Sequence, residues 1–224
     1  MSFKDNINTW IFDLDNTLYS ADSGIFQQVH KLMGEFVAKN LNMELAEAKK
    51  LQAKYYKQHG TTLRGMMDNH GVDPDYFLEE VHKLDYSIVG PNQNLNDELY
   101  KLEGRKIIYT NANKQHVLDV LEKINLTNFF DEIYDIKIAD YIPKPEISPY
   151  EKIIDLFDIE ANKSAMFDDI AKNLVPAKKV GFTPVWVDAG YENFSDDIEA
   201  SKEYLDFQTR DLSLFLKDVN EGKI

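Results

Sequence analysis

The sequence lacks cysteine and is short of basic residues. With no cysteine, disulfides, thiolate metal sites and cysteine nucleophiles are excluded, and a reducing cytoplasm is the expected location. Lys and Arg number 25 against 39 Asp and Glu, which gives a net charge of −14 at pH 7. A nucleic acid polymer or an anionic membrane is therefore not expected as a partner, because either would need a basic surface.

Long apolar runs are also missing. No stretch of about 18 consecutive apolar residues occurs, and the first residues do not combine a basic region with an apolar one. We expect neither a membrane span nor a secretion signal. The chain has 224 residues, of which 43% are hydrophobic and 12% are aromatic. This composition is enough for a substantial core, either in one domain or in a domain with an insertion.

Residues 9–18 read Thr-Trp-Ile-Phe-Asp-Leu-Asp-Asn-Thr-Leu, an apolar run that stops at two aspartates. Because successive side chains of a strand alternate between its faces, Asp13 and Asp15 should point the same way while Leu14 enters the core. At ~5 Å and an effective dielectric of ~20 their repulsion would cost roughly 3 kcal/mol, so the pair needs a cation, a shared proton or a wide separation. Alternatively, Asp-Asn after a strand is ordinary turn chemistry.

The next seventy residues carry helical patterning and no convincing strand. The apolar spacing and the turn residues predict helices at 25–39, 44–58, 61–69 and 74–84. This block looks like a helical insertion.

From about residue 91 the pattern changes to alternating strands and helices, which predicts an α/β fold: a Rossmann-like parallel sheet with helices on both faces. The expected strands are Lys106–Thr110, Glu132–Ile136, Ala165–Phe167 and Pro184–Val187, with a possible edge strand at Tyr204–Phe207. The expected helices are 95–102, 114–124, 148–157, 171–180 and Leu212–Val219. Pro176 should make the helix at 171–180 start late or bend.

In such a sheet, ligands bind outside the carboxyl ends of the strands, so the residues just after each strand carry functional weight. These positions hold hydroxyl, amide, ammonium and carboxylate groups: Asp13, Asp15, Thr17, Thr110, Asn111, Lys144, Asp168 and Asp169. The set suits phosphoryl transfer, since oxygen ligands select a hard cation such as Mg²⁺. We assign Asp13, Asp15, Asp168 and Asp169 to the metal site.

Within this set, Asp13 can attack phosphorus and form an aspartyl phosphate. Asp15 can protonate the leaving oxygen and then deprotonate the attacking water. Thr110, Asn111 and Lys144 would bind the phosphate oxygens. Each element alone also has a structural interpretation: Thr110-Asn111 as a helix cap, Lys144 as a loop lysine between prolines, and Asp168-Asp169 as another cap.

The pattern resembles the haloacid dehalogenase superfamily of phosphatases over nearly the whole chain. Its four motifs stand in order: Phe-Asp-Leu-Asp-Asn-Thr-Leu at 12–18, Tyr-Thr-Asn at 109–111, Pro-Lys-Pro at 143–145 and Met-Phe-Asp-Asp at 166–169. The resemblance implies the same roles for these residues. It also implies a catalytic core of residues 1–19 and 91–224 covered by a helical cap of residues 20–90. Dehalogenases proper lack the aspartate at position 15, so its presence favours a phosphatase.

The segments 51–67 and 81–87, with Leu18-Tyr19 and residues 110–116, are similar to the pyrimidine 5′-nucleotidase branch. That resemblance implies a nucleoside monophosphate such as UMP or CMP as substrate. In the cap, Tyr56, His59 and Arg64 offer aromatic surface and hydrogen-bond donors for a base. Core packing is an alternative for these side chains, and it is favoured for Tyr55.

Three further hypotheses stay open. The chain could be a sugar-phosphate or phosphoglycolate phosphatase, a phosphomutase, or a non-catalytic phosphate-binding protein.

The remaining polar residues have open roles. His82, Asp85 and Tyr86 could form a structural hydrogen-bond network or contact substrate, while His30, His70 and His116 are expected to be surface or satisfied polar groups. The protein should be a monomer or a homodimer.

Overall fold

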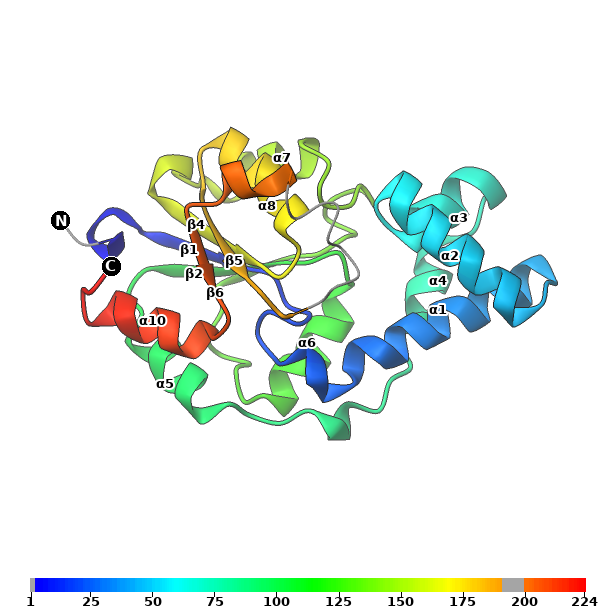
Figure 1. Cartoon of the computed structure of the whole chain (residues 1–224), viewed down its shortest axis with the longest axis horizontal. Helices are drawn as coiled ribbons and strands as arrows, with labels where there is room; N and C mark the ends of the chain where they lie inside the picture. Colours follow the sequence, from blue (N-terminus) through cyan, green and yellow to red (C-terminus); the bar gives the residue numbers. More distant parts are fainter. Residues whose placement is uncertain (1–2, 191–199) are drawn as a thin grey trace.

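The computed structural model describes residues 3–190 and 200–224, and its centre is a parallel sheet (Figure 1). Within the described residues the sheet has six strands in the order β3-β2-β1-β4-β5-β6, and every neighbouring pair is parallel. The strands are β1 Thr9–Phe12, β2 Arg105–Tyr109, β3 Glu132–Tyr134, β4 Ser164–Asp168, β5 Thr183–Val187 and β6 Phe207–Thr209. After β1, the chain adds β2 and then β3 on one side of β1. It then crosses to the other side of β1 and adds β4, β5 and β6 there. The strand order therefore reverses between β1 and β4, where a parallel sheet opens a binding crevice.

Strand β1 is buried on both faces, as its apolar sequence predicts for a central parallel strand. Trp10 and Phe12 enter one hydrophobic cluster, and Ile11 enters the other. Phe12 also stacks on Phe167 of β4, with ring centroids 4.6 Å apart. Packing on both faces of the sheet and against β4 therefore holds the end of β1 in place.

Helices cover both faces of the sheet (Figure 1). They are α5 Gln93–Lys101, α6 Lys114–Lys123, α7 Ser148–Phe157, α8 Ala171–Val180 and α10 Leu212–Asn220. Residues of α5, α6 and α10 pack in the cluster of Trp10, and those of α7 and α8 pack in the cluster of Ile11. This is the predicted Rossmann-like arrangement.

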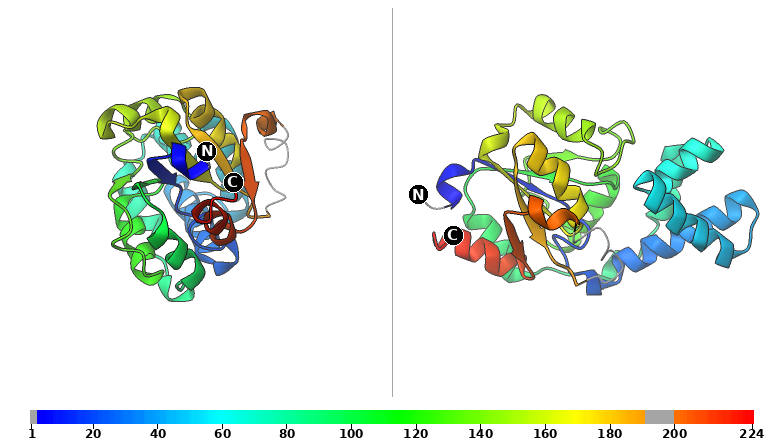
Figure 2. Two further views of the ribbon diagram at one scale, coloured as in Figure 1. Left: turned by 90° about the vertical axis from the view of Figure 1, so that its left-hand side faces the viewer. Right: turned by 45° about the horizontal axis from the view of Figure 1, so that its top comes forward.

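A helical segment stands at one end of the sheet (Figures 1 and 2). It consists of α1 Ile25–Leu41, α2 Leu45–His59, α3 Thr62–His70 and α4 Pro74–Val81, and it has its own hydrophobic cluster. From the core side, Ile136 belongs to that cluster and Tyr141 packs against it. The prediction of an all-helical insertion is thus confirmed for its secondary structure.

Polar contacts and close packing join the helical segment to the core near the sheet's carboxyl edge. Asp75 at the start of α4 forms an ion pair with Lys137 at 2.7 Å and accepts a hydrogen bond from the Tyr141 hydroxyl at 2.7 Å. The turn between α2 and α3 approaches the loop at 143–145, because a Cβ added to Gly60 would lie 3.3 Å from a Pro143 carbon. The helical segment therefore touches the loop that carries Lys144.

The structure moves some predicted boundaries. Strand β2 ends at Tyr109 and β3 at Tyr134, so Thr110 and Ile136 lie beyond them. The edge strand predicted at Tyr204–Phe207 is a short 3-10 helix, Lys202–Tyr204, followed by β6. Helix α8 begins at Ala171 and continues through Pro176, so it does not start late. Among the described residues, no helix is both long and apolar enough to cross a membrane.

Candidate active site

The two aspartates of the first strand lie where β1 stops and the chain turns. The Asp13 amide still donates to the Phe167 carbonyl at 2.8 Å, so this residue continues the sheet's hydrogen bonding. Leu14 is fully buried in the core. Asn16 adopts a positive φ of 61°, a conformation that asparagine tolerates in turns. The turn that competed with the functional interpretation is therefore present, and it is what presents Asp13 and Asp15.

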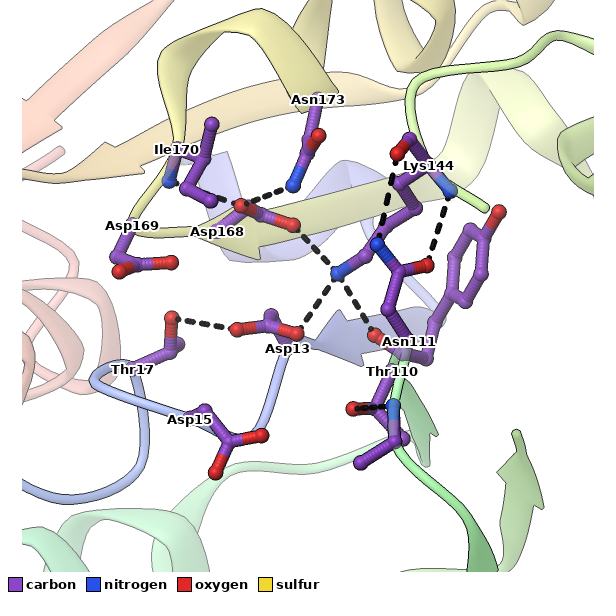
Figure 3. A network of polar contacts seen from close by, with 12 residues as sticks. Asp13, Asp15, Thr17, Thr110, Asn111, Lys144, Asp168, Asp169, Ile170 and Asn173 are labelled. Carbon is purple, nitrogen blue, oxygen red and sulfur yellow. Dashed lines mark hydrogen bonds and ion pairs between the residues drawn. The ribbon is translucent and has the colours of Figure 1, made fainter. Parts of the chain in front are cut away.

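Lys144 lies between two carboxylates (Figure 3). Its ammonium nitrogen is 2.7 Å from Asp13 Oδ1, 2.6 Å from Asp168 Oδ2 and 3.1 Å from the Tyr109 carbonyl oxygen. Asn111 fixes the backbone of this lysine: the Lys144 amide donates to Asn111 Oδ1 at 2.9 Å. Lys144 is therefore a buried ionic centre and not an exposed loop lysine.

Asp13, Asp168 and Asp169 form a compact group of carboxylates (Figure 3). One oxygen from each lies within 4.8 Å of the others. Asp168 Oδ1 accepts hydrogen bonds from the Ile170 amide and the Asn173 side chain, both at 2.9 Å, which fixes its orientation. The oxygen-only donor set is the kind that holds a hard divalent cation.

The electrostatics of this group also fit a cation. Burial, together with repulsion from Asp168, raises the pKa of Asp13 to about 7 even though Lys144 opposes the rise. Burial and the neighbouring Asp13 carboxylate raise the pKa of Asp169 well above its usual range. One ammonium does not balance three acids, so a bound divalent cation would relieve the remaining repulsion.

The Asn16 side chain lies next to the same carboxylate group. Its side-chain amide donates to Asp169 Oδ2 at 3.3 Å, while its buried Oδ1 atom has no hydrogen-bond partner among the described residues. A buried oxygen without a partner costs free energy. A metal ion or its water would supply that partner.

Asp15 stands outside the carboxylate group and has its own environment. Its Oδ1 atom accepts a hydrogen bond from His116 Nε2 at 2.8 Å and another from the Tyr19 hydroxyl. Burial would raise the pKa of Asp15, but the His116 ring and the Tyr19 hydroxyl outweigh it and lower the pKa to about 2. Its assignment as a metal ligand stays a prediction.

Two threonines complete the edge of the site. Thr110 is buried directly after β2, and its hydroxyl oxygen accepts from the Ala112 amide at 3.0 Å, which leaves the hydroxyl hydrogen able to donate. The Thr17 hydroxyl lies 3.4 Å from Asp13 Oδ2. Figure 3 shows both groups beside Asp13.

The predicted base-binding residues lie around the turn between α2 and α3. His59 Nδ1 and Arg64 Nε each lie 3.1 Å from the same Asp68 carboxylate oxygen. Asp68 therefore holds the imidazole and the guanidinium group next to each other. Tyr56 is partly buried. Tyr55 is buried in the cluster of the helical segment, which confirms its assignment to core packing.

Sequence reasoning did not find several residues that support the site. They are Asn16, Tyr19, Asn173 and the His116 pair with Asp15. Asn173 lies five positions after Asp168, and its place in α8 could have suggested contact with that carboxylate. The His116 pair joins residues 101 positions apart, and no local sequence signal predicts it.

The chain is similar in sequence to known proteins. The sequence profile of the haloacid dehalogenase-like hydrolases matches residues 10–187. Phosphate metabolism protein 8 from Saccharomyces cerevisiae is 25% identical over 190 residues, which cover 77% of this chain and 59% of that protein. The chain thus spans about three fifths of the length of this curated relative.

Solved structures of low sequence identity share the fold. A HAD phosphatase from Thermococcus onnurineus superposes with a TM-score of 0.61 at 18% identity, covering 96% of this chain and 97% of its own. The L-2-haloacid dehalogenase from Xanthobacter autotrophicus with covalently bound chloropropionic acid gives 0.59 at 15% identity, covering 95% and 98%. YfnB from Bacillus subtilis, described as a HAD hydrolase and bound to magnesium, gives 0.60 at 14% identity, covering 96% and 99%.

Proposed function

The chain belongs to the haloacid dehalogenase-like hydrolase family, and on that premise we propose that it is a Mg²⁺-dependent phosphomonoester hydrolase. The observation that carries the proposal is the separation of two carboxylates at one strand end. Asp13 lies in the carboxylate group that suits a cation, whereas Asp15 lies outside it against His116 and Tyr19. An enzyme that forms and then hydrolyses an acyl phosphate uses both a nucleophile and a separate acid/base.

In the proposed reaction, an Asp13 oxygen attacks phosphorus and forms an acyl phosphate as the bond to the leaving oxygen breaks. Asp15, ionised at rest because its pKa is about 2, takes a proton from the bound phosphate monoanion and passes it to that oxygen, which departs as an alcohol. Asp15 then removes a proton from water, the water attacks phosphorus, inorganic phosphate leaves as the Asp13 carboxylate is restored, and the proton on Asp15 passes to solvent. Lys144 and Thr110 stand next to Asp13 and can stabilise charge on the transferring group.

We propose that Mg²⁺ is held by Asp13, Asp168 and Asp169. Bound there, the ion would neutralise charge on the phosphate and the nucleophile. The donor set, the raised pKa of Asp13 and the unpartnered Asn16 oxygen support this, and the structurally similar YfnB holds magnesium.

For the substrate, we propose a pyrimidine nucleoside 5′-monophosphate such as UMP or CMP, with residues 20–90 as a cap over the site. The position of the α2–α3 turn beside the Lys144 loop supports this, because Gly60, the residue after His59, lies close to the loop whose lysine contacts Asp13. Arg64 shares Asp68 with His59 and lies in the first turn of α3. The name of the yeast relative points to phosphate metabolism in general. A sugar-phosphate or phosphoglycolate phosphatase uses the same core chemistry and is the alternative.

The test is phosphate release from a panel of phosphomonoesters with Mg²⁺. We expect turnover that Asp13→Asn removes, because the amide cannot act as the nucleophile, with UMP and CMP among the best substrates. The exposed Asp158 supplies a matched control, since Asp158→Asn makes the same chemical change at the C-terminal end of α7, outside the carboxylate group. Release from no ester, or undiminished release in Asp13→Asn, contradicts the hydrolase; release without preference for UMP or CMP contradicts only the substrate.

A further inference from the structure

His116 is a completely buried histidine whose contacts lead to Asp15. It lies in the first turn of α6, where its amide is capped by the Asn113 side chain at 2.9 Å. Its Nε2 atom is 2.8 Å from Asp15 Oδ1. An ionised carboxylate can only accept, so Nε2 is the donor in this hydrogen bond. The ring is therefore fixed in position by the helix and directed at one oxygen of Asp15.

The other side of the ring contacts the segment that returns from the helical residues to the core. His116 Nδ1 lies 2.9 Å from the Tyr86 hydroxyl. The His82 ring stacks on the His116 ring with centroids 4.5 Å apart and an interplanar angle of 20°. Burial and the adjacent His116 lower the pKa of His82 to about 3, so His82 is neutral near pH 7. A hydrogen bond thus joins the Tyr86 hydroxyl to Nδ1, on the side of the ring opposite Asp15.

Both donors to Asp15 use the same oxygen. Tyr19 and His116 contact Oδ1, and within the described residues no protein group donates to Oδ2. In a carboxylic acid that delivers a proton, one oxygen carries the proton and the other can accept hydrogen bonds. Anchoring Oδ1 twice fixes the rotation of the group and leaves Oδ2 for the leaving oxygen and the water.

We propose that His116 is a positioning residue that holds Asp15 in the orientation required for proton transfer. The inference rests on the proposed hydrolase function and deepens it. The chain of contacts from Tyr86 through His116 to Asp15 also ties the acid/base to the segment leaving the helical residues, so displacement of that segment would loosen Asp15.

Two substitutions separate the hydrogen bond to Asp15 from the loss of the ring. In His116→Gln, the side-chain amide nitrogen can take the place of Nε2 and donate to Asp15. In His116→Asn, the shorter amide reaches only the place of Nδ1 and cannot reach Asp15. Both changes replace imidazole with an amide at one buried site, so each is the control for the other.

The measurement is kcat/KM for p-nitrophenyl phosphate and for phenyl phosphate, two esters of similar shape. Nitrophenolate leaves readily without a proton, whereas a phenol of pKa about 10 gains from protonation. We expect His116→Asn to lower kcat/KM for phenyl phosphate about 10- to 100-fold more than for the nitrophenyl ester, less than the ~10²- to 10⁴-fold contribution of acid–base catalysis because Asp15 itself is still present. His116→Gln should keep the wild-type ratio within about threefold, well below the effect expected for His116→Asn. His70→Asn, at a histidine bonded to Tyr55 in the helical segment, should keep both values.

Equal losses on both esters, or equal effects of Gln and Asn, overturn the inference, because a structural defect does not discriminate between leaving groups. Thermal unfolding confirms that each variant folds. If His116→Asn does not fold, Tyr19→Phe removes the second donor to Oδ1, and the same but smaller change of ratio is expected; an unchanged ratio overturns the inference. Wild-type protein that hydrolyses neither ester, nor any other, contradicts the proposed function itself.

Discussion

At the scale of single residues, two aspartates only two positions apart have opposite electrostatic environments. The pKa of Asp13 is raised to about 7 and that of Asp15 is lowered to about 2. The difference arises because Asp13 faces other carboxylates while Asp15 faces the His116 ring and the Tyr19 hydroxyl. The raised pKa of Asp13 belongs to the metal-free group of acids, and a cation bound there would lower it again, so the two surroundings suit a metal-linked nucleophile and a separate proton-transfer group.

Asp15→Asn tests this division of roles. Turnover should fall about 10²- to 10⁴-fold, because the amide can neither donate the proton to the leaving group nor take one from water. Mg²⁺ binding and binding of a phosphate mimic should stay close to wild type, since Asp15 lies outside the group of Asp13, Asp168 and Asp169. Steady-state kinetics and calorimetric titration measure both effects. Near-normal turnover in this variant refutes the assignment of Asp15 as acid/base.

Sequence reasoning predicted the principal site residues because parallel strands end at one edge. It placed Asp13, Thr110, Lys144 and Asp168 together from order alone, and the structure brings Asp13, Lys144 and Asp168 into contact. It did not predict that the Lys144 ammonium bridges two acids, since that depends on side-chain rotamers and a buried loop. The pairing of His116 with Asp15 depends on how α6 packs against the turn after β1, which no local pattern encodes.

At the scale of elements, the helices were predicted within a few residues because their apolar spacing is strong. The residue range of α7, for example, agrees at both ends. Strand ends were less accurate, and β6 was placed too early because a three-residue edge strand carries little pattern. Pro176 was expected to make α8 start late or bend, and the helix starts at Ala171 and continues through the proline. Tertiary packing decided these positions against local propensity.

Gly65 shows how closely two helices of the helical segment approach. A Cβ at Gly65 would lie 2.4 Å from Tyr55 Cγ and 2.5 Å from Tyr55 Cβ, so the α3 backbone rests directly on the α2 side chain. Tyr55 is itself buried, which leaves it little room to move. This contact fixes how α2 and α3 pack against each other at the turn that follows His59.

Gly65→Ala should therefore destabilise the protein, although alanine is the better helix former by about 1 kcal/mol. Overpacking costs about 1 to 3 kcal/mol, and the 2.4 Å approach to Tyr55 places the cost toward the upper end, so after the helix gain we expect a net loss of roughly 2 kcal/mol. Urea denaturation gives the free energy of unfolding. Gly90→Ala is the control, because no atom lies within 4 Å of a Cβ there and its φ is not positive. A Gly65→Ala protein as stable as wild type contradicts the close packing.

At the scale of the whole molecule, the carboxylate group makes folding depend on pH and on metal. Folded-state pKa values raised above the unfolded value of about 3.8, as for Asp13 and Asp169, mean that the folded protein binds these protons more tightly. Their contribution to stability is present below about pH 4 and is lost as pH rises through about 7 for Asp13. Without metal, the crowded acids thus increasingly destabilise the protein as pH rises through this window.

Mg²⁺ should reverse that loss, and its effect should grow with pH because the ion binds the deprotonated acids. At one hundred times its dissociation constant it would add about 2.7 kcal/mol, or roughly 5 to 10 °C in Tm. We expect a clearly larger shift at pH 8 than at pH 5 in thermal unfolding with Mg²⁺ or with EDTA. Asp169→Asn should raise the metal-free Tm at pH 8, because it removes one repelling carboxylate, and should lose most of the Mg²⁺ shift. Asp158→Asn should behave as wild type. A Mg²⁺ shift that is the same at both pH values, or one that Asp169→Asn retains, would show that the ion does not bind at this carboxylate group.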